Sequence, residues 1–170
     1  MITAYVGLGA NLGDLRRTLE AALADLADVQ GLTLDAVSSA WRSAPVDCEG
    51  PDYLNAVARV RTDLAALALL DALQAIERRH GRERPYVNAP RTLDLDLLLH
   101  GDELLALERL TVPHPRLHQR AFVLKPLLEL DPALHAPGLG ALGAHLPAVA
   151  AQAIEREVEP LRRPHGSFGP

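Results

Sequence analysis

Apolar residues recur along the first part of the chain with two different periods, which predict a strand followed by a helix. Residues 2–9 are mostly apolar and end in a glycine-rich turn, as is typical of a strand. From about Leu15, apolar residues recur at the spacing of one helical face as far as Leu26. Turn and capping residues over 11–14 separate the two elements.

Two more strands are predicted on either side of a loop. Residues 32–43 are rich in Leu, Val and Ser, and they predict one continuous strand. Proline and glycine interrupt residues 44–52, which indicates a loop. Over residues 53–61, small or aliphatic side chains alternate with polar or larger ones, so this strand should turn one face toward the core.

A second helix and a final strand complete the pattern of the first hundred residues. We expect Asp63 to cap the helix, which ends at Gly81 after a basic last turn. The apolar run over 90–99 then predicts a buried strand. The order β-α-β-β-α-β is typical of an α+β, ferredoxin-like sandwich, in which an antiparallel sheet carries both helices on one face and leaves the other face available for a ligand.

The remainder of the chain predicts weaker elements. Residues 110–115 should be extended, and helices are expected over 117–129 and 141–155. A length of 170 residues with 48% hydrophobic residues suits one packed domain, which we place at 1–160. Residues 161–170 are rich in Pro and Gly and predict an irregular C-terminal tail.

Charge and cysteine content exclude several classes of protein. The formal net charge of −5 argues against a general nucleic-acid binder, which usually carries a basic surface. No segment reaches the roughly 18 uninterrupted apolar residues of a membrane helix, so we expect a cytoplasmic protein that does not contact a membrane. Cys48 is the only cysteine, which excludes an intramolecular disulfide and a cysteine-based metal cage.

Two carboxylates, Asp94 and Asp96, interrupt the apolar run of the last predicted strand. Residues two apart in a strand lie roughly 7 Å apart on one face, so both side chains should point away from the core together. With Arg91 nearby, such oxygen ligands suit magnesium and a phosphorylated substrate better than zinc. The pattern alone also fits a solvated strand face without function.

Arginines gather around these aspartates, although the chain is acidic overall. Almost all of its positive charge is arginine, and Lys125 is the only lysine. Guanidinium groups stay charged and can bind phosphate oxygens in a bidentate manner. The cluster comprises, before and after the aspartates, Arg78, Arg79, Arg82, Arg84, Arg91, Arg109, Arg116 and Arg120.

Four motifs in register make the chain similar to a known family. Between Tyr5 and about Pro132 it resembles the hydroxymethyldihydropterin pyrophosphokinases of folate biosynthesis. No single motif is specific, but their order and spacing are. The motifs are GLGANLG at residues 7–13, PDYLN at 51–55, PRTLDLDLLL at 90–99, and LTVPH at 110–114 followed by Arg120 and Phe122.

The resemblance implies a reaction and a set of catalytic residues. Members of this family transfer a pyrophosphoryl group from the co-substrate ATP to the 6-hydroxymethyl group of 6-hydroxymethyl-7,8-dihydropterin and release AMP. Two Mg²⁺ ions bound by Asp94 and Asp96 are implied, in agreement with the pattern of the strand itself. Arg82 and Arg91 are implied to act beside these aspartates on the phosphates. We expect the protein to act as a monomer.

The resemblance also implies residues that bind each substrate. Asn88 stands where relatives often carry a tryptophan and cannot provide its stacking surface, so either another side chain such as Tyr86 covers the site or that wall is missing. For ATP the implied residues are Gln74, Glu77, Arg82, Arg84, Arg91, Arg109, Thr111, His114 and Arg120. For the pterin, Asn55 would bind the ring edge and two aromatic residues would form walls; the full set is Ser43, Ala44, Val46, Tyr53, Asn55 and Phe122.

Other functions fit the same pattern less well. A ferredoxin-like sensor would bind a nucleotide without turning it over, and it predicts ATP binding with no AMP. An RNA-binding domain of this fold needs aromatic residues on adjacent strands, but aromatic residues are only 4% of this chain. A glycosyltransferase could use the two aspartates, but its nucleotide-binding fold needs a longer chain.

Overall fold

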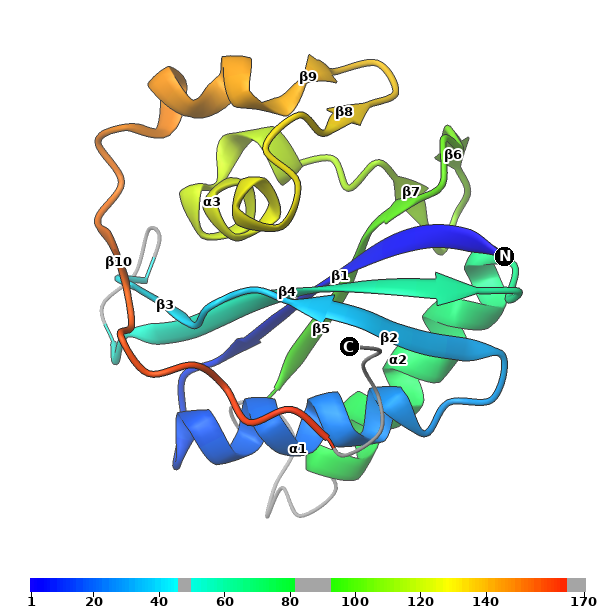
Figure 1. Cartoon of the computed structure of the whole chain (residues 1–170), viewed down its shortest axis with the longest axis horizontal. Coiled ribbons are helices and arrows are strands. Elements are labelled where there is room, and N and C mark those ends of the chain that lie inside the picture. Colours follow the sequence, from blue (N-terminus) through cyan, green and yellow to red (C-terminus); the bar gives the residue numbers. More distant parts are fainter. Residues whose placement is uncertain (46–49, 82–92, 165–170) are drawn as a thin grey trace.

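A central antiparallel sheet organises the molecule (Figure 1). The computed structural model describes residues 1–45, 50–81 and 93–164. The strands lie in the order β10-β3-β4-β1-β5, and β2 also pairs with β4. Their bounds are β1 Ile2–Ala10, β2 Leu32–Val37, β3 Trp41–Ser43, β4 Tyr53–Thr62, β5 Asp94–His100 and β10 Ile154–Arg156. The predicted ferredoxin-like α+β fold is confirmed.

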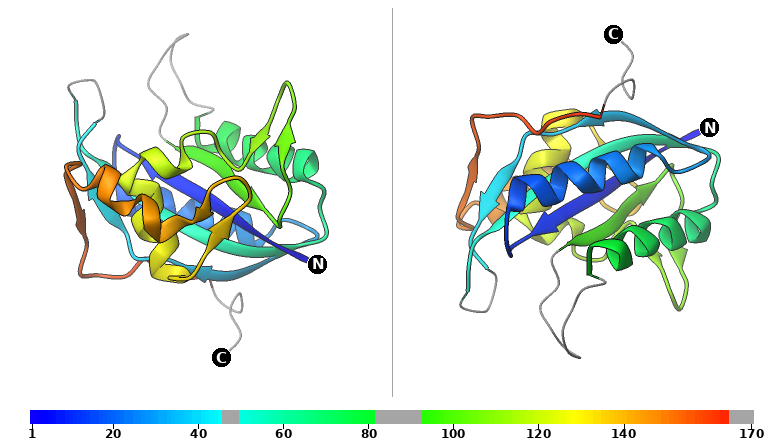
Figure 2. Two further views of the ribbon diagram at one scale, coloured as in Figure 1. Left: turned by 90° about the horizontal axis from the view of Figure 1, so that it is seen from above. Right: turned by 90° about the horizontal axis from the view of Figure 1, so that it is seen from below.

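Two helices cover one face of the sheet, as predicted (Figures 1 and 2). Helix α1 (Leu15–Ala27) begins where the sequence indicates, after Asp14, whose carboxylate accepts the N–H of Arg17 at 3.2 Å. Helix α2 (Ala66–Gly81) lies beside it and buries Leu73 and other apolar residues. Together with the inner face of the sheet, these helices form the larger hydrophobic core.

The opposite face keeps the space that was expected for a ligand, but further helices also cover part of it. Helix α3 (Ala121–Leu130) and the 3-10 helix η2 (Leu142–Val149) lie over part of it. A second hydrophobic core joins them to the sheet through residues such as Leu98, Leu124 and Leu127, each 1% exposed or less. The face therefore carries helices over one part and leaves space for a ligand beside α3.

The predicted strand over 32–43 is two strands, β2 and β3, that pair with successive parts of β4. Ser38 interrupts the run because its hydroxyl accepts the N–H of Val57 at 2.9 Å, in place of a backbone carbonyl. Ser39 then donates its N–H and its hydroxyl to Glu129 of α3. Serine side chains that compete for backbone hydrogen bonds thus end β2. The spacing of apolar residues along the sequence does not predict this break.

Three further predictions are corrected at helix ends. Asp63 does not cap α2, which begins three residues later, and instead faces the N-terminal ammonium at 3.5 Å. The helix expected over 117–129 is divided by Arg120, whose extended backbone separates the 3-10 helix η1 (Leu117–Gln119) from α3. The helix expected over 141–155 becomes η2 followed by strand β10.

Two small hairpins and the C-terminal segment complete the fold. The extended stretch predicted over 110–115 contains β7 (Thr111–Val112), which pairs with β6 (Leu105–Ala106). Strand β8 (His135–Ala136) pairs with β9 (Gly140–Ala141). Over the described part of the chain, no helix is long and apolar enough to cross a membrane.

Candidate active site

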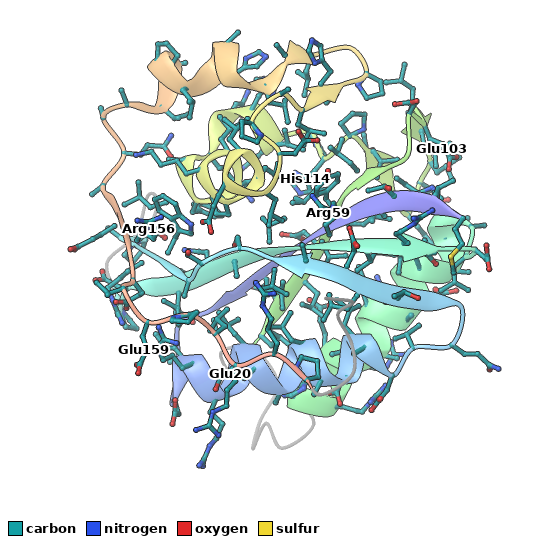
Figure 3. The ribbon with its side chains drawn as sticks, in the orientation of Figure 1. Glu20, Arg59, Glu103, His114, Arg156 and Glu159 are labelled. Atoms are coloured by element: carbon teal, nitrogen blue, oxygen red, sulfur yellow. The ribbon has the colours of Figure 1, made fainter. Side chains whose placement is uncertain are left out.

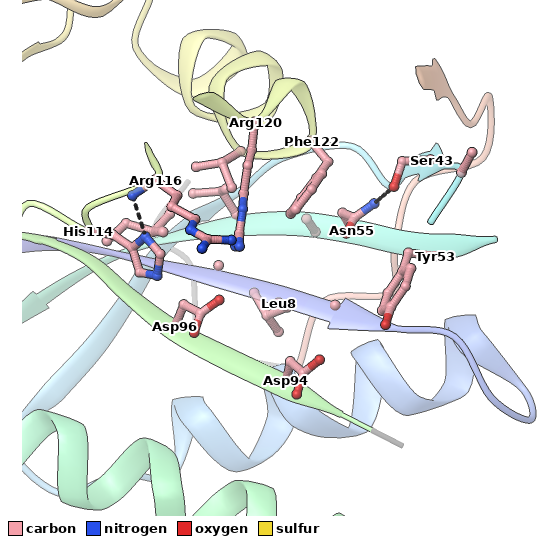
Figure 4. Close-up of a pocket in the computed structure, with 17 residues that line it drawn as sticks. Leu8, Ser43, Tyr53, Asn55, Asp94, Asp96, His114, Arg116, Arg120 and Phe122 are labelled. Carbon is pink, nitrogen blue, oxygen red and sulfur yellow. Dashed lines mark hydrogen bonds between the residues drawn. The ribbon is translucent and has the colours of Figure 1, made fainter. Parts of the chain in front are cut away.

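A cavity of about 490 Å³ opens between the sheet and the start of α3 (Figure 4). Its floor is the face of the sheet that α3 leaves uncovered, and its wall comes from the segment between β7 and α3. The lining residues come from distant parts of the sequence: Gly7, Leu8, Gly9, Ser43, Ala44, Tyr53, Asn55, Ala56, Val57, Asp94, Asp96, Leu98, His114, Arg116, Arg120, Phe122 and Val123.

The register of the sheet brings the two aspartates to this floor. Asp94 lies opposite Gly9 of β1, and Asp96 lies opposite Gly7. Both carboxylates project to the same side of β5 (Figure 4). Both glycines line the cavity, and a Cβ added to Gly7 would lie 3.5 Å from the side chain of Leu98, in ordinary contact. The sequence prediction that the aspartates share a face therefore matches the geometry of the strand.

Strand β5 is the edge of the sheet, and Glu77 of α2 supports its outer side. The carboxylate of Glu77 accepts the N–H of Leu95 at 3.0 Å. Leu95 stands between Asp94 and Asp96, so this bond fixes the backbone from which both carboxylates project. Glu77 does not line this cavity and contacts the strand instead.

The donor set around β5 fits magnesium. Among the described residues, no group of three or more His, Cys, Asp or Glu side chains could hold a metal ion by itself. Two carboxylates on the rim of an open cavity instead provide part of an oxygen shell, and Mg²⁺ usually completes its shell with water and substrate phosphates. A structural zinc site would need four protein ligands.

Asn55 is held in one orientation at the other side of the floor. It is only 4% exposed, and its Nδ2 donates to Ser43 Oγ at 2.8 Å and to the Trp41 carbonyl at 3.0 Å. A Cβ added to Gly9 would lie 3.4 Å from Asn55 Oδ1, so glycine keeps room beside the amide. Asn55 and Ser43 therefore present a fixed set of polar atoms to a ligand in the cavity.

Aromatic residues stand on both sides of this polar pair. Figure 4 shows Phe122 on the α3 side of the cavity and Tyr53 at the outer end of β4. The guanidinium carbon of Arg120 lies 5.5 Å from the centroid of the Phe122 ring. Flat apolar surfaces beside hydrogen-bonding groups suit a planar heterocycle.

His114 is fixed in the loop that follows β7. Its backbone N–H donates to the Leu98 carbonyl at 2.9 Å, and its ring Nδ1 accepts the N–H of Arg116 at 3.1 Å. Burial lowers the pKa of His114, Asp96 opposes this effect, and Arg120 and Arg116 add to it. The ring is therefore neutral at pH 7. Because Nδ1 accepts a bond, the proton lies on Nε2, which becomes a donor.

A second hollow of about 280 Å³ adjoins the cavity. Arg109, Thr111 and Pro115 line it, and the two hollows share Asp96 and His114. Arg109 also donates to Gln74 Oε1 of α2 at 3.2 Å, which places Gln74 at the edge of this hollow. The two spaces therefore adjoin at Asp96 and His114, as an elongated ligand would require.

The structure brings most of the predicted site residues together. Nine line the cavity, two line the second hollow, and Gln74 and Glu77 lie beside these spaces. Their individual roles stay predictions. Four predicted site residues lie outside the described residues, namely Val46, Arg82, Arg84 and Arg91. Asn88 lies outside them as well. The nine residues of the cavity are Ser43, Ala44, Tyr53, Asn55, Asp94, Asp96, His114, Arg120 and Phe122.

Arg116 and the two glycines of the floor were not assigned to the site from the sequence. Arg116 belongs to the arginine cluster around the aspartates, and it stands two residues after His114 and four before Arg120. That position is the one signal that could have identified it. The alternation of β1 would have placed Gly7 and Gly9 on one face, but only the register of the sheet sets them against the aspartates.

Comparisons with known proteins agree on one family. Residues 5–132 match the family model described as 7,8-dihydro-6-hydroxymethylpterin-pyrophosphokinase (HPPK). A Haemophilus influenzae protein named 2-amino-4-hydroxy-6-hydroxymethyldihydropteridine pyrophosphokinase is 46% identical over 138 residues, which are 81% of this chain and 86% of that protein. A Pseudomonas aeruginosa protein of the same name is 46% identical over 157 residues, 89% of this chain and 94% of that protein.

Solved structures show the same fold at lower sequence identity. A structure described as "Crystal Structure Analysis of the HPPK-DHPS in complex with substrates" superimposes with a TM-score of 0.69 at 13% identity. The match covers 86% of this chain but only 43% of that one, so this chain spans less than half of the solved chain. At this identity the similarity shows the fold alone.

Proposed function

The chain belongs to the 7,8-dihydro-6-hydroxymethylpterin-pyrophosphokinase family, and we propose that the cavity beside α3 is its active site. The reaction of this family transfers pyrophosphate from ATP to hydroxymethyldihydropterin in folate biosynthesis. One observation carries the assignment. Two carboxylates of β5, a buried amide of β4 and an aromatic ring of α3 meet around a single cavity, although they are far apart in the sequence.

We assign the acidic side of the cavity to the metal and the phosphates. Asp94 and Asp96 would hold the two Mg²⁺ ions, which when bound offset phosphate charge and polarise the phosphoryl group. Support comes from their common face and from the oxygen donor set. Glu77 keeps β5 in place through Leu95, so its role in the proposal is to position the strand.

His114 and the arginines would orient the phosphates. A neutral His114 with its proton on Nε2 can donate to a phosphate oxygen without adding charge. Arg120 lines the same cavity, and its guanidinium can bind phosphate oxygens in a bidentate manner. Arg109 and Thr111 line the second hollow and would contact the nucleoside end of ATP. Arg82, Arg84 and Arg91 complete the proposed set from outside the described residues.

The other side of the cavity would hold the pterin. Asn55 and Ser43 would bind the polar edge of the ring, and Tyr53 and Phe122 would cover its faces. Ala44 leaves space for the ring, and Val46, which lies outside the described residues, completes the proposed set. The 6-hydroxymethyl oxygen would then attack the β-phosphorus of ATP, the bond from that phosphorus to the α–β bridging oxygen would break to release AMP, and the hydroxyl proton would pass to water. Catalysis by this arrangement is chiefly positioning and electrostatic stabilisation.

Product analysis tests the proposal. The protein is incubated with Mg²⁺, ATP and 6-hydroxymethyl-7,8-dihydropterin, and the nucleotides are resolved. We expect AMP that forms only when the pterin is present. The double variant Asp94→Asn, Asp96→Asn should lower the rate by about a hundredfold or more, because bound metal contributes several kcal/mol to such reactions.

A matched variant and two alternative results complete this test. Asp102→Asn removes one exposed carboxylate after the far end of β5 and should keep the full rate. Formation of ADP would contradict pyrophosphoryl transfer. Measurable ATP binding without any AMP would favour a nucleotide sensor instead. The monomeric state and the cytoplasmic location expected from the sequence stay predictions, and light scattering would measure the first.

A further inference from the structure

Arg116 lines the cavity but belongs neither to the proposed ATP-binding set nor to the proposed pterin-binding set. Figure 4 shows its side chain and that of Arg120 converging over the floor, on the side of Asp96. We propose that Arg116 is a further phosphate-binding residue, which holds the pyrophosphoryl group that is transferred. This inference rests on the proposed function, because it assumes that ATP occupies the cavity.

The guanidinium of Arg116 has no acidic partner among the described residues. No carboxylate there lies within ion-pair distance of Arg116 or Arg120. Other arginines of the chain are paired: Arg42 with Glu157 at 2.9 Å and Arg59 with Asp35 at 2.7 Å. Two unpaired cations that converge in one cavity are suited to an anionic ligand.

The position of Arg116 indicates which part of the nucleotide it would bind. The cavity and the second hollow share only Asp96 and His114 among their lining residues. Arg116 lines the cavity but not the second hollow. A nucleotide with its nucleoside end beside Arg109 must pass His114 before its phosphates reach the pterin side. Arg116 therefore faces the distal phosphates, which are the two that leave ATP in the reaction.

The backbone of Arg116 binds His114, whereas its side chain faces the cavity, so a substitution can remove the second contact and keep the first. The backbone N–H holds His114 Nδ1, and an alanine at this position retains that N–H. The variant Arg116→Ala thus removes the guanidinium and keeps the bond that fixes the tautomer of His114. Since the side chain is exposed, its loss should not disturb folding, and the free energy of unfolding can confirm this.

Nucleotide binding without turnover is the measurement. Calorimetry with Mg²⁺ compares α,β-methylene-ATP, which cannot release AMP, with AMP, which lacks the distal phosphates. Arg116→Ala should weaken α,β-methylene-ATP binding about tenfold to a hundredfold, as expected for the loss of a charged hydrogen bond, and should leave AMP binding unchanged. Arg17→Ala, which removes an exposed arginine of α1, should leave both affinities unchanged.

The outcomes separate this inference from the proposed function. If wild-type protein binds α,β-methylene-ATP and forms AMP, but Arg116→Ala binds the analogue as tightly as Arg17→Ala does, the inference is wrong and the proposed function stands. An equal loss of affinity for AMP also overturns it, because Arg116 would then act on the nucleoside monophosphate. If the wild-type protein forms no AMP, the proposed function itself fails.

Discussion

Two polar residues of the cavity, Asn55 and His114, are held by bonds that leave a second polar atom for a ligand. Asn55 uses its Nδ2 for Ser43 and for the backbone of Trp41. His114 uses Nδ1 for the backbone of Arg116, so its Nε2 carries the proton. Such bonds order the side chains before a substrate arrives, which lowers the entropy lost on binding.

The lowered pKa of His114 predicts a dependence of stability on pH. Because burial lowers this pKa in the folded protein, the unfolded chain binds more protons below its ordinary value of about 6.5. The contribution to stability is therefore complete above pH 6.5 and is lost as the pH falls toward the folded pKa. Urea unfolding at pH 7.5 and 5.5 should show a smaller loss in His114→Asn than in the wild type. Equal losses would contradict this assignment.

Helix α3 is attached to the sheet by polar contacts at its C-terminal end. Glu129 accepts the N–H and hydroxyl of Ser39 at 2.8 Å each and the indole N–H of Trp41 at 2.9 Å. Arg59 points from β4 toward α3 and donates to the Leu130 carbonyl at 3.4 Å (Figure 3). These contacts span the break between β2 and β3, so they connect α3 to the strand that carries Ser43.

Removal of the Glu129 carboxylate should loosen this attachment. We expect Glu129→Ala to lower the free energy of unfolding by about 1–2 kcal/mol, because three donors lose their acceptor while remaining partly solvated. Trp41 is the only tryptophan of the chain, so its fluorescence reports the change directly. Glu155→Ala, on the exposed side of β10, is the matched control and should change stability by less than about 0.5 kcal/mol.

At the scale of the whole molecule, the C-terminal segment closes the fold beyond the residues that match the family. It pairs with β3 as β10 and then runs to α1, where Arg16 donates to the Pro160 carbonyl at 3.2 Å. Glu20 accepts the N–H of Arg162 there, and Glu20 and Glu159 can be located in Figure 3. The domain boundary expected at residue 160 stays a prediction, but Leu161 lies within the larger core at 5% exposure.

Two variants of this segment test whether it contributes to the core. Leu161→Ala should lower the free energy of unfolding by about 2–4 kcal/mol, because it leaves a cavity in the larger core. Val158→Ala removes a fully exposed side chain and should change it by less than about 0.5 kcal/mol. Equal, small effects in chemical denaturation would mean that the segment does not add to the stability of the domain.

Local sequence patterns were sufficient to predict the helices and strands that form the core. Asp14 and the apolar face of α1 act within a few residues of one another, so the sequence predicts that helix directly. The common face of Asp94 and Asp96 follows in the same way from the alternation of a strand. The family was also evident from four short motifs, because their order and spacing are properties of the chain itself.

Contacts between residues far apart in the sequence decided the features that local patterns do not predict. Ser38 ends β2 only because Val57 lies opposite it, and β10 is a strand only because β3 offers an edge with which to pair. The position of Arg116 over the floor depends on how the segment before α3 folds back on the sheet, which no local period encodes. The sequence by itself therefore determined the core elements and the family, whereas the tertiary structure decided which side chains share the cavity, since packing and pairing act between residues far apart in the chain.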